Sequence, residues 1–184
     1  MTASIFSSQE SQSSASRRDW LIARYAAIAC CIHILEAAFP SPLPGVKPGL
    51  ANMITLYVFM RHGWQMAAWV VGLRVLASSL LLGTFLGPSF FLSSSGAIAA
   101  LIGITGCTVL FSPSRLSAIG LSVVAAQLHV VAQLSVAYVW FLPQPALWHL
   151  LPILLVMATA SGILTGALTN RLLIYSDAQE ASKT

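Results

Sequence analysis

Charged residues are scarce in this chain, and their scarcity excludes most classes of soluble protein. Only 8% of the 184 residues are Asp, Glu, Lys or Arg, whereas soluble domains carry about 25%. Hydrophobic residues make up 57% of the chain, and the mean hydropathy is +0.82. We therefore expect lipid to surround most of the chain. The basic residues form no run, so we expect no nucleic-acid partner.

Acidic residues and cysteines are too few to build the common catalytic and metal sites. Of five acidic residues, only Glu36 falls inside an apolar stretch, so no carboxylate pair is available to hold Mg²⁺. The chain has no Walker A or GxGxxG motif, and its three cysteines lack disulfide or zinc spacing. We expect no metal, no catalytic residues and no enzymatic activity of its own.

Long apolar stretches are abundant, and they predict the fold class. A membrane-spanning helix needs about 20 apolar residues, so the chain has room for about six. One stretch of about a dozen residues cannot cross a hydrocarbon core of about 30 Å. The prediction is an all-α integral membrane protein of about six transmembrane helices, the second of them short. The stretches are 20–39, 49–61, 64–86, 90–111, 115–142 and 147–174.

A proline-rich segment, FPSPLPGVKPGLAN, precedes the short second helix. Its prolines fix φ and keep the preceding residues out of the helical region, which predicts an extended outer loop. The Ser-rich residues 1–18 predict a disordered cytosolic tail. The transmembrane helical domain is then 19–175, followed by a second cytosolic tail at 176–184.

The basic residues near or beyond the ends of the apolar stretches predict how the chain is oriented. With six spans both termini lie on one side, and only Lys47 falls on the other, so we place both termini in the cytosol. The protein is then a multi-pass protein of the cell (inner) membrane. The basic residues assigned to the cytosolic side are Arg17, Arg18, Arg61, Arg115, Arg171 and Lys183.

Apart from these basic residues near the span ends, three charged residues lie within the predicted spans. Arg24 is close enough to the cytosolic end to reach water. Arg74 lies near the middle of its span, where an arginine costs at least about 2.5–3.5 kcal/mol. It needs a structural partner or an anionic ligand in a wet cavity. Glu36 shares a helix face with His33, and either caps the proline loop or contacts a substrate or a proton.

Uncharged polar residues extend this set. His129 and Gln133 lie one helical turn apart in LHVVAQL, so they share a face, and either pack internally or line a cavity with Arg74. Ser93, Ser94, Ser95 and Gly96 open the fourth stretch, where they could bind a ligand or pack helices. Two pairs of small residues allow close helix packing. These pairs are Gly162 with Gly166 and Ala23 with Ala27.

These features resemble the Gx transporter family, also called heptaprenyl diphosphate synthase component I, membrane type. The resemblance runs through EAAFPSPLPGVKPGLAN, Arg74, Gly83, SSSGA and the His/Gln pair, over roughly residues 20–174. Its most specific part is Glu36, the proline loop and the run GLAN. One departure is Val130, which follows His129 where the family pattern has Asn.

The resemblance implies a fold and a docking surface. The family is similar to the substrate-binding subunits of energy-coupling-factor vitamin transporters, six-helix proteins whose site opens outward beneath the loop after the first helix. In those subunits an AxxxA pair docks on a coupling subunit, which implies that role for Ala23 and Ala27. Members of the family also look linked to polyprenyl synthases and to flavin-based extracytosolic electron transfer.

The leading functional hypothesis is a transporter-like protein with an outward-facing intramembrane pocket. It would bind a small anionic or amphipathic ligand, such as a flavin, a vitamin precursor or an isoprenoid phosphate. A coupling ATPase would be a further partner beside the lipid bilayer. The expected ligand-binding residues are Glu36, Lys47, Asn52, Arg74, Ser95, His129 and Gln133.

Two alternatives remain open. The chain could be a membrane subunit of a quinone or flavin electron-transfer complex, with a redox partner. It could also be a membrane accessory subunit of a polyprenyl diphosphate synthase. The residues predict no cofactor; a flavin or a quinone would be the cofactor in the electron-transfer alternative.

Overall fold

The computed structural model describes residues 2–38, 49–111 and 116–182, and all regular elements there are helical. Five helical segments are long and apolar enough to cross a membrane, and α2, with 13 residues, is the short helix. The prediction of an all-α membrane protein with a short second helix is confirmed. The helices are α1 (Thr2–Ala38), α2 (Leu50–His62), α3 (Trp64–Leu81), α4 (Pro88–Leu110), α5 (Ala118–Val136) and α6 (Leu151–Ala181).

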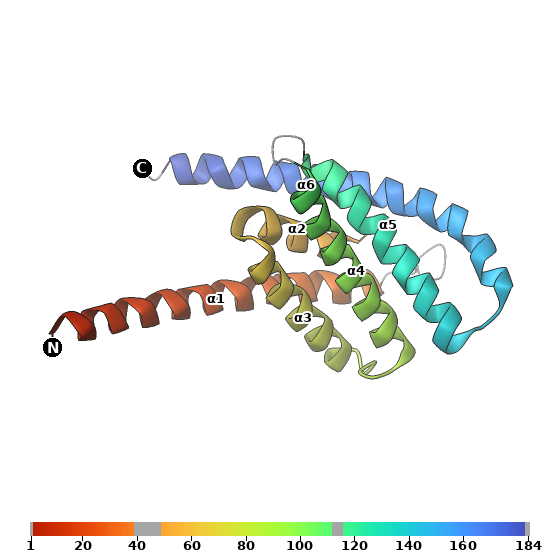
Figure 1. Ribbon diagram of the computed structural model, residues 1–184, viewed down its shortest axis with the longest axis horizontal. Helices are drawn as coiled ribbons and strands as arrows, with labels where there is room; N and C mark the ends of the chain where they lie inside the picture. Colours follow the sequence, from red (N-terminus) through yellow and green to blue (C-terminus); the bar gives the residue numbers. More distant parts are fainter. Residues whose placement is uncertain (1, 39–48, 112–115, 183–184) are drawn as a thin grey trace.

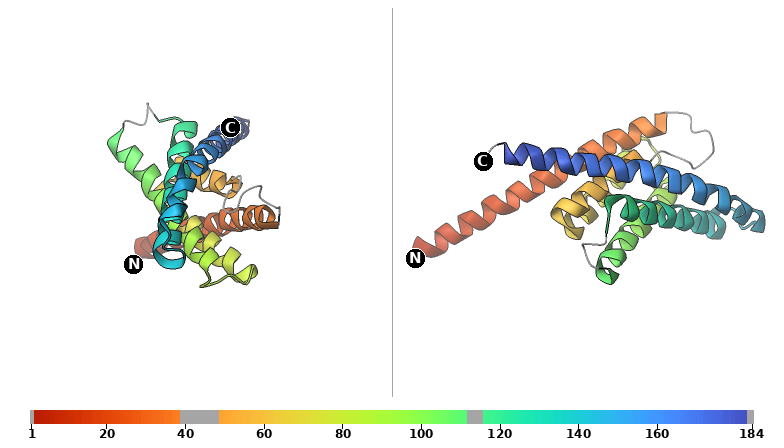
Figure 2. Two further views of the ribbon diagram at one scale, coloured as in Figure 1. Left: turned by 90° about the vertical axis from the view of Figure 1, so that its right-hand side faces the viewer. Right: turned by 90° about the horizontal axis from the view of Figure 1, so that it is seen from above.

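The helices form one bundle in which α5 packs between α4 and α6, and α1 packs on α3 (Figures 1 and 2). The short α2 contacts α1, α3 and α6. A π-helical turn, Ala137–Phe141, prolongs α5, and a 3₁₀ turn, Pro145–Leu150, leads into α6. The start of α1 and the end of α6 project from the same end of the bundle (Figure 1).

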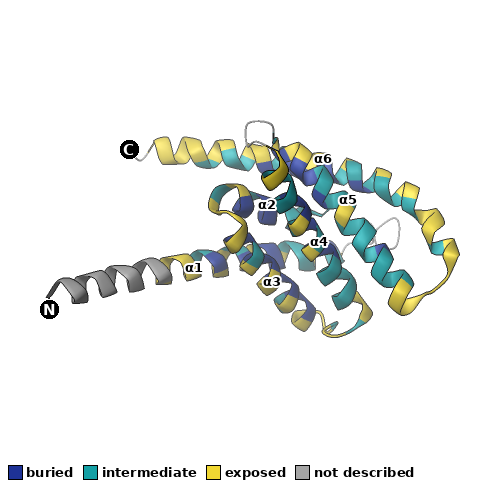
Figure 3. Cartoon of the chain, in the orientation of Figure 1, coloured by how far each residue is buried: buried dark blue, intermediate teal, exposed yellow. Residues whose placement is uncertain are grey.

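Side chains are distributed as expected for a protein dissolved in lipid. Large apolar residues such as Trp69, Ile102 and Val109 are exposed on the outside, Val109 by 79%. Val58 and Val70 fill the core, together with small and hydroxyl-bearing residues such as Thr169. The buried faces turn toward the centre of the bundle (Figure 3). Lipid can cover apolar side chains on the outside of the bundle, so the chain needs few charged residues on that surface.

Glycines with positive φ set two helix boundaries. Gly63, with φ 86°, is the single residue between α2 and α3, and its N–H donates to Phe59 O at 2.9 Å. Gly83, with φ 67°, ends α3 before the close of the predicted stretch, and Thr84 N–H then donates to Ser79 O at 2.8 Å. This left-handed conformation favours glycine because a Cβ would be strained there.

Both terminal segments are helical in the described structure. Helix α1 begins at Thr2, within the 1–18 tail that the sequence predicts to be disordered. Helix α6 continues to Ala181, within the 176–184 tail, for which the sequence predicts no conformation. Extending an existing helix needs no new nucleus, so polar residues of modest propensity can continue it. The apolar part of α1 that could span a membrane begins only at Ser16.

Polar contacts tie together the end of the bundle from which the termini project. Arg18 Nη2 donates to Gln65 Oε1 at 3.1 Å, which joins α1 to the start of α3. Arg61, at the end of α2, forms ion pairs with Asp177 and Glu180 on α6. Basic residues that the sequence assigns to one side of the membrane, Arg18 and Arg61, therefore lie at the same end of the bundle.

Candidate functional site

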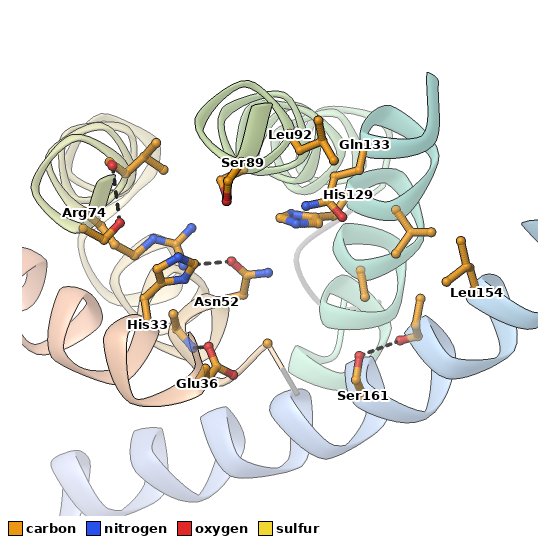
Figure 4. Close-up of a pocket in the computed structure, with 18 of the residues that line it drawn as sticks. His33, Glu36, Asn52, Arg74, Ser89, Leu92, His129, Gln133, Leu154 and Ser161 are labelled. Atoms are coloured by element: carbon orange, nitrogen blue, oxygen red, sulfur yellow. Dashed lines mark hydrogen bonds between the residues drawn. The ribbon is translucent and has the colours of Figure 1, made fainter. Parts of the chain in front are cut away.

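A cavity of about 340 Å³ lies between the helices at the end of the bundle away from the termini (Figure 4). It is enclosed by the last turns of α1, the first turns of α2 and α4, and parts of α3, α5 and α6. Because six helices contribute, residues far apart in the sequence meet here. The polar residues in its lining are His33, Glu36, Asn52, Arg74, Ser78, Ser89, Ser93, His129, Gln133 and Ser161.

Arg74 is the buried cation of this cavity. Its side chain projects from α3 into the cavity (Figure 4), and the residue is only 5% exposed. Nη1 donates to Asn52 Oδ1 at 3.1 Å, whereas Nε has no partner among the described residues. The described residues also contain no ion pair between Arg74 and Glu36. The guanidinium, with five N–H donors, therefore keeps hydrogen-bonding capacity for a further acceptor.

Glu36 lines the cavity and at the same time caps α2. Its Oε1 accepts the N–H of Leu50 at 2.6 Å, and Oε2 accepts the N–H of Ala51 at 3.5 Å. The first N–H groups of a helix have no partner within that helix, and Gly49 at the N-cap has no side chain to supply one. The carboxylate of Glu36, a residue of α1, therefore takes the place of the missing side-chain cap of α2.

His129 and Gln133 both line the cavity, as their spacing on α5 predicts (Figure 4). The imidazole of His129 lies against Gly96 on α4 so closely that a Cβ at Gly96 would be 2.6 Å from Nε2. Its Nδ1 is buried and has no hydrogen-bond partner among the described residues. Because Gly96 has no Cβ, α4 can approach the imidazole on α5 this closely.

Five of the expected ligand-binding residues share this cavity, and two do not belong to the described lining. Glu36, Asn52, Arg74, His129 and Gln133 converge there. Ser95 is not part of the lining, because it lies two residues after Ser93 on α4 and therefore about 200° further around the helix axis; its hydroxyl donates to Leu92 O at 3.0 Å. Lys47 lies outside the described residues. The predicted docking residues Ala23 and Ala27 are exposed on α1, away from the cavity.

Sequence reasoning missed several serines in the lining. Ser78 lies four residues after Arg74, so the same i, i+4 rule that pairs His129 with Gln133 would have found it. Ser89, also missed, lies four residues before Ser93 on α4, and both face the cavity; Ser93 is one of the serines that the sequence singles out. No comparable signal pointed to Ser161 on α6.

The remaining wall of the cavity is apolar. Leu92 and Val130 contribute from α4 and α5, and Leu154, Met157 and Ala158 from α6. The described residues contain no group of three or more His, Cys, Asp or Glu side chains that could hold a metal ion. The cavity can therefore offer hydrogen bonds, one guanidinium and an apolar surface to a bound molecule.

Fold and site together define a multi-pass helical membrane protein with a polar cavity inside its bundle. A family model described as heptaprenyl diphosphate synthase component I matches residues 25–172. The chain belongs to this family, and the matched range contains every residue of the cavity lining. Neither the curated proteins nor the solved structures gave a significant match.

Proposed function

We propose that this protein binds a small anionic or amphipathic ligand in the cavity around Arg74, as a transporter-like membrane protein. The observation that carries the proposal is a buried guanidinium with hydrogen-bonding capacity left over, facing a cavity of about 340 Å³. Pockets for small molecules usually have volumes of about 300–1,000 Å³. A charge this deep in an apolar bundle is costly, and such charges generally face a partner group or a functional cavity.

Equilibrium binding to the purified protein in lipid nanodiscs tests the proposal. Flavins, vitamin precursors and isoprenoid phosphates form the ligand panel. At least one should bind, and Arg74→Ala should weaken it by about tenfold or more, because a hydrogen bond to a charged group contributes about 1.5–3 kcal/mol. Arg24→Ala is the matched control, since Arg24 is exposed beside Trp20. Equal affinity for every ligand in wild type and Arg74→Ala would contradict the proposal.

A second candidate function is favoured by the family to which the chain belongs. The family's name implies a membrane component of heptaprenyl diphosphate synthase, which works with another component. The one carboxylate in the described cavity lining, Glu36, is engaged by α2, and Mg²⁺-dependent chemistry needs several oxygen ligands. We propose that this chain is not itself the enzyme. Prenyl-chain elongation by the purified chain alone would overturn that.

We also propose that the protein lies in the cell inner membrane with both termini in the cytosol. The grouping of Arg18 and Arg61 at the end from which α1 and α6 project supports this orientation. The cavity would then open toward the outer side. A reporter that is active only in the cytosol should work when it is fused to either terminus, and failure at both termini would contradict the orientation.

A further inference from the structure

The cavity has a polar side and an apolar side, and this asymmetry constrains any molecule that fills it. Arg74, Asn52 and Glu36 come from α3, α2 and α1, respectively, on one side. Leu154 and Met157 come from α6, on the other side. Figure 4 shows Arg74 and Leu154 across the cavity from each other, with His129 and Gln133 beside the apolar part. A ligand with one polar end and one apolar end matches this arrangement.

The charges around the cavity limit the charge of the ligand. Among the described lining residues, Arg74 supplies the one guanidinium and Glu36 the one carboxylate. The carboxylate accepts N–H groups at the start of α2, where a helix carries roughly half a positive charge. Glu36 is thus engaged by α2 and forms no ion pair with Arg74 among the described residues, so the guanidinium can meet one negative charge. A second negative charge on the ligand would find no second guanidinium or ammonium among the described lining residues.

We infer that the cavity takes a singly charged amphipathic anion, with a carboxylate-type head at Arg74 and a short apolar body against Leu154 and Met157 of α6. The inference rests on the proposed function and narrows its ligand class. The planar guanidinium suits a carboxylate because two N–H groups can bind its two oxygens. A volume near the lower limit for ligand pockets restricts the length of the apolar body. Diphosphates, which carry several charges, are disfavoured.

Four probes of equal alkyl chain length test the inference on the wild-type protein. They are a carboxylate, an amine, an alcohol and a diphosphate, titrated into phosphatidylcholine nanodiscs with and without the protein, so that partitioning into lipid can be subtracted. The carboxylate should bind about tenfold tighter than each of the others, as one charge-assisted hydrogen-bonding site allows. An amine or diphosphate that binds equally well or better would overturn the inference but leave ligand binding intact.

The position of the apolar body is tested by filling its end of the cavity. Met157→Trp should shorten the longest alkyl carboxylate that binds, while the shortest binding carboxylate keeps its affinity. Val156→Trp is the matched control, because Val156 is the neighbouring residue on α6 and is 67% exposed. Identical chain-length limits in both variants would overturn the placement. If no probe and no member of the wider ligand panel binds, the proposed function fails as well.

Discussion

Replacing Gly166 by alanine should destabilise the protein by about 1–3 kcal/mol, the usual cost of overpacking. A Cβ at this position would lie 2.5 Å from Ile119 Cα and 3.0 Å from Ala118 O. These are backbone atoms of α5, which cannot rotate away as a side chain can. Helices α5 and α6 would have to separate, which would also strain the buried hydrogen bond of 2.7 Å between Ser122 and Thr165.

A glycine elsewhere in the bundle provides the matched control for this prediction. A Cβ at Gly106 on α4 would have no neighbour within 4 Å, so Gly106→Ala should gain up to about 1 kcal/mol from helix propensity. The two variants should therefore shift the apparent melting temperature of the detergent-purified protein in opposite directions. Equal shifts would show that the contact between α5 and α6 does not limit stability.

The number of helices and the short length of α2 could be predicted because the bilayer ties a spanning helix to its apolar length. Backbone groups in lipid must bond within their own helix, so each long apolar stretch became a helix, and 49–61 became the short α2. The pair Gly162 and Gly166 was expected to serve internal packing. The structure confirms this, with both glycines against the backbone of α5.

The rotation of each helix about its axis could be predicted only where polar residues mark a face. On α5 the pair His129 and Gln133 marks one, and both residues reach the cavity. On α4 neighbouring serines mark several faces at once. Ser93 faces the cavity and Ser95 does not. Apolar residues give no such information, because lipid and the protein interior are equally apolar.

Contacts between segments far apart in the chain could be predicted least well. The sequence left Glu36 with two readings, a cap for the proline loop or a contact for substrate. The structure puts its carboxylate on the N–H groups of Leu50 and Ala51, where the proline-rich segment ends and α2 begins, 14 residues along the chain at Leu50. That placement depends on how α1 and α2 pack. Helix periodicity within α1 carries no information about it.

Glu36→Ala should destabilise the protein by about 2 kcal/mol, through the loss of a charge-assisted cap on α2. Glu36 is only 8% exposed, so water cannot readily replace its oxygens at the N–H groups of Leu50 and Ala51. The first turn of α2 also carries Asn52, which accepts the hydrogen bond from Arg74. Loosening this turn should therefore weaken ligand binding as well as folding.

Two further variants separate the buried cap from a general effect of losing a carboxylate. Glu36→Gln keeps one oxygen acceptor and should lose about half as much stability, because the remaining hydrogen bond is no longer charge-assisted. Glu180→Ala removes an exposed carboxylate that pairs with Arg61, and should change stability little, since surface ion pairs contribute weakly. Hydrogen exchange at the amides of Leu50 and Ala51 should accelerate most in Glu36→Ala, less in Glu36→Gln and not in Glu180→Ala. Unchanged exchange at these amides would mean that the hydrogen bond of 2.6 Å from Leu50 to Glu36 does not hold the start of α2. Packing would then be what positions Asn52 and Arg74.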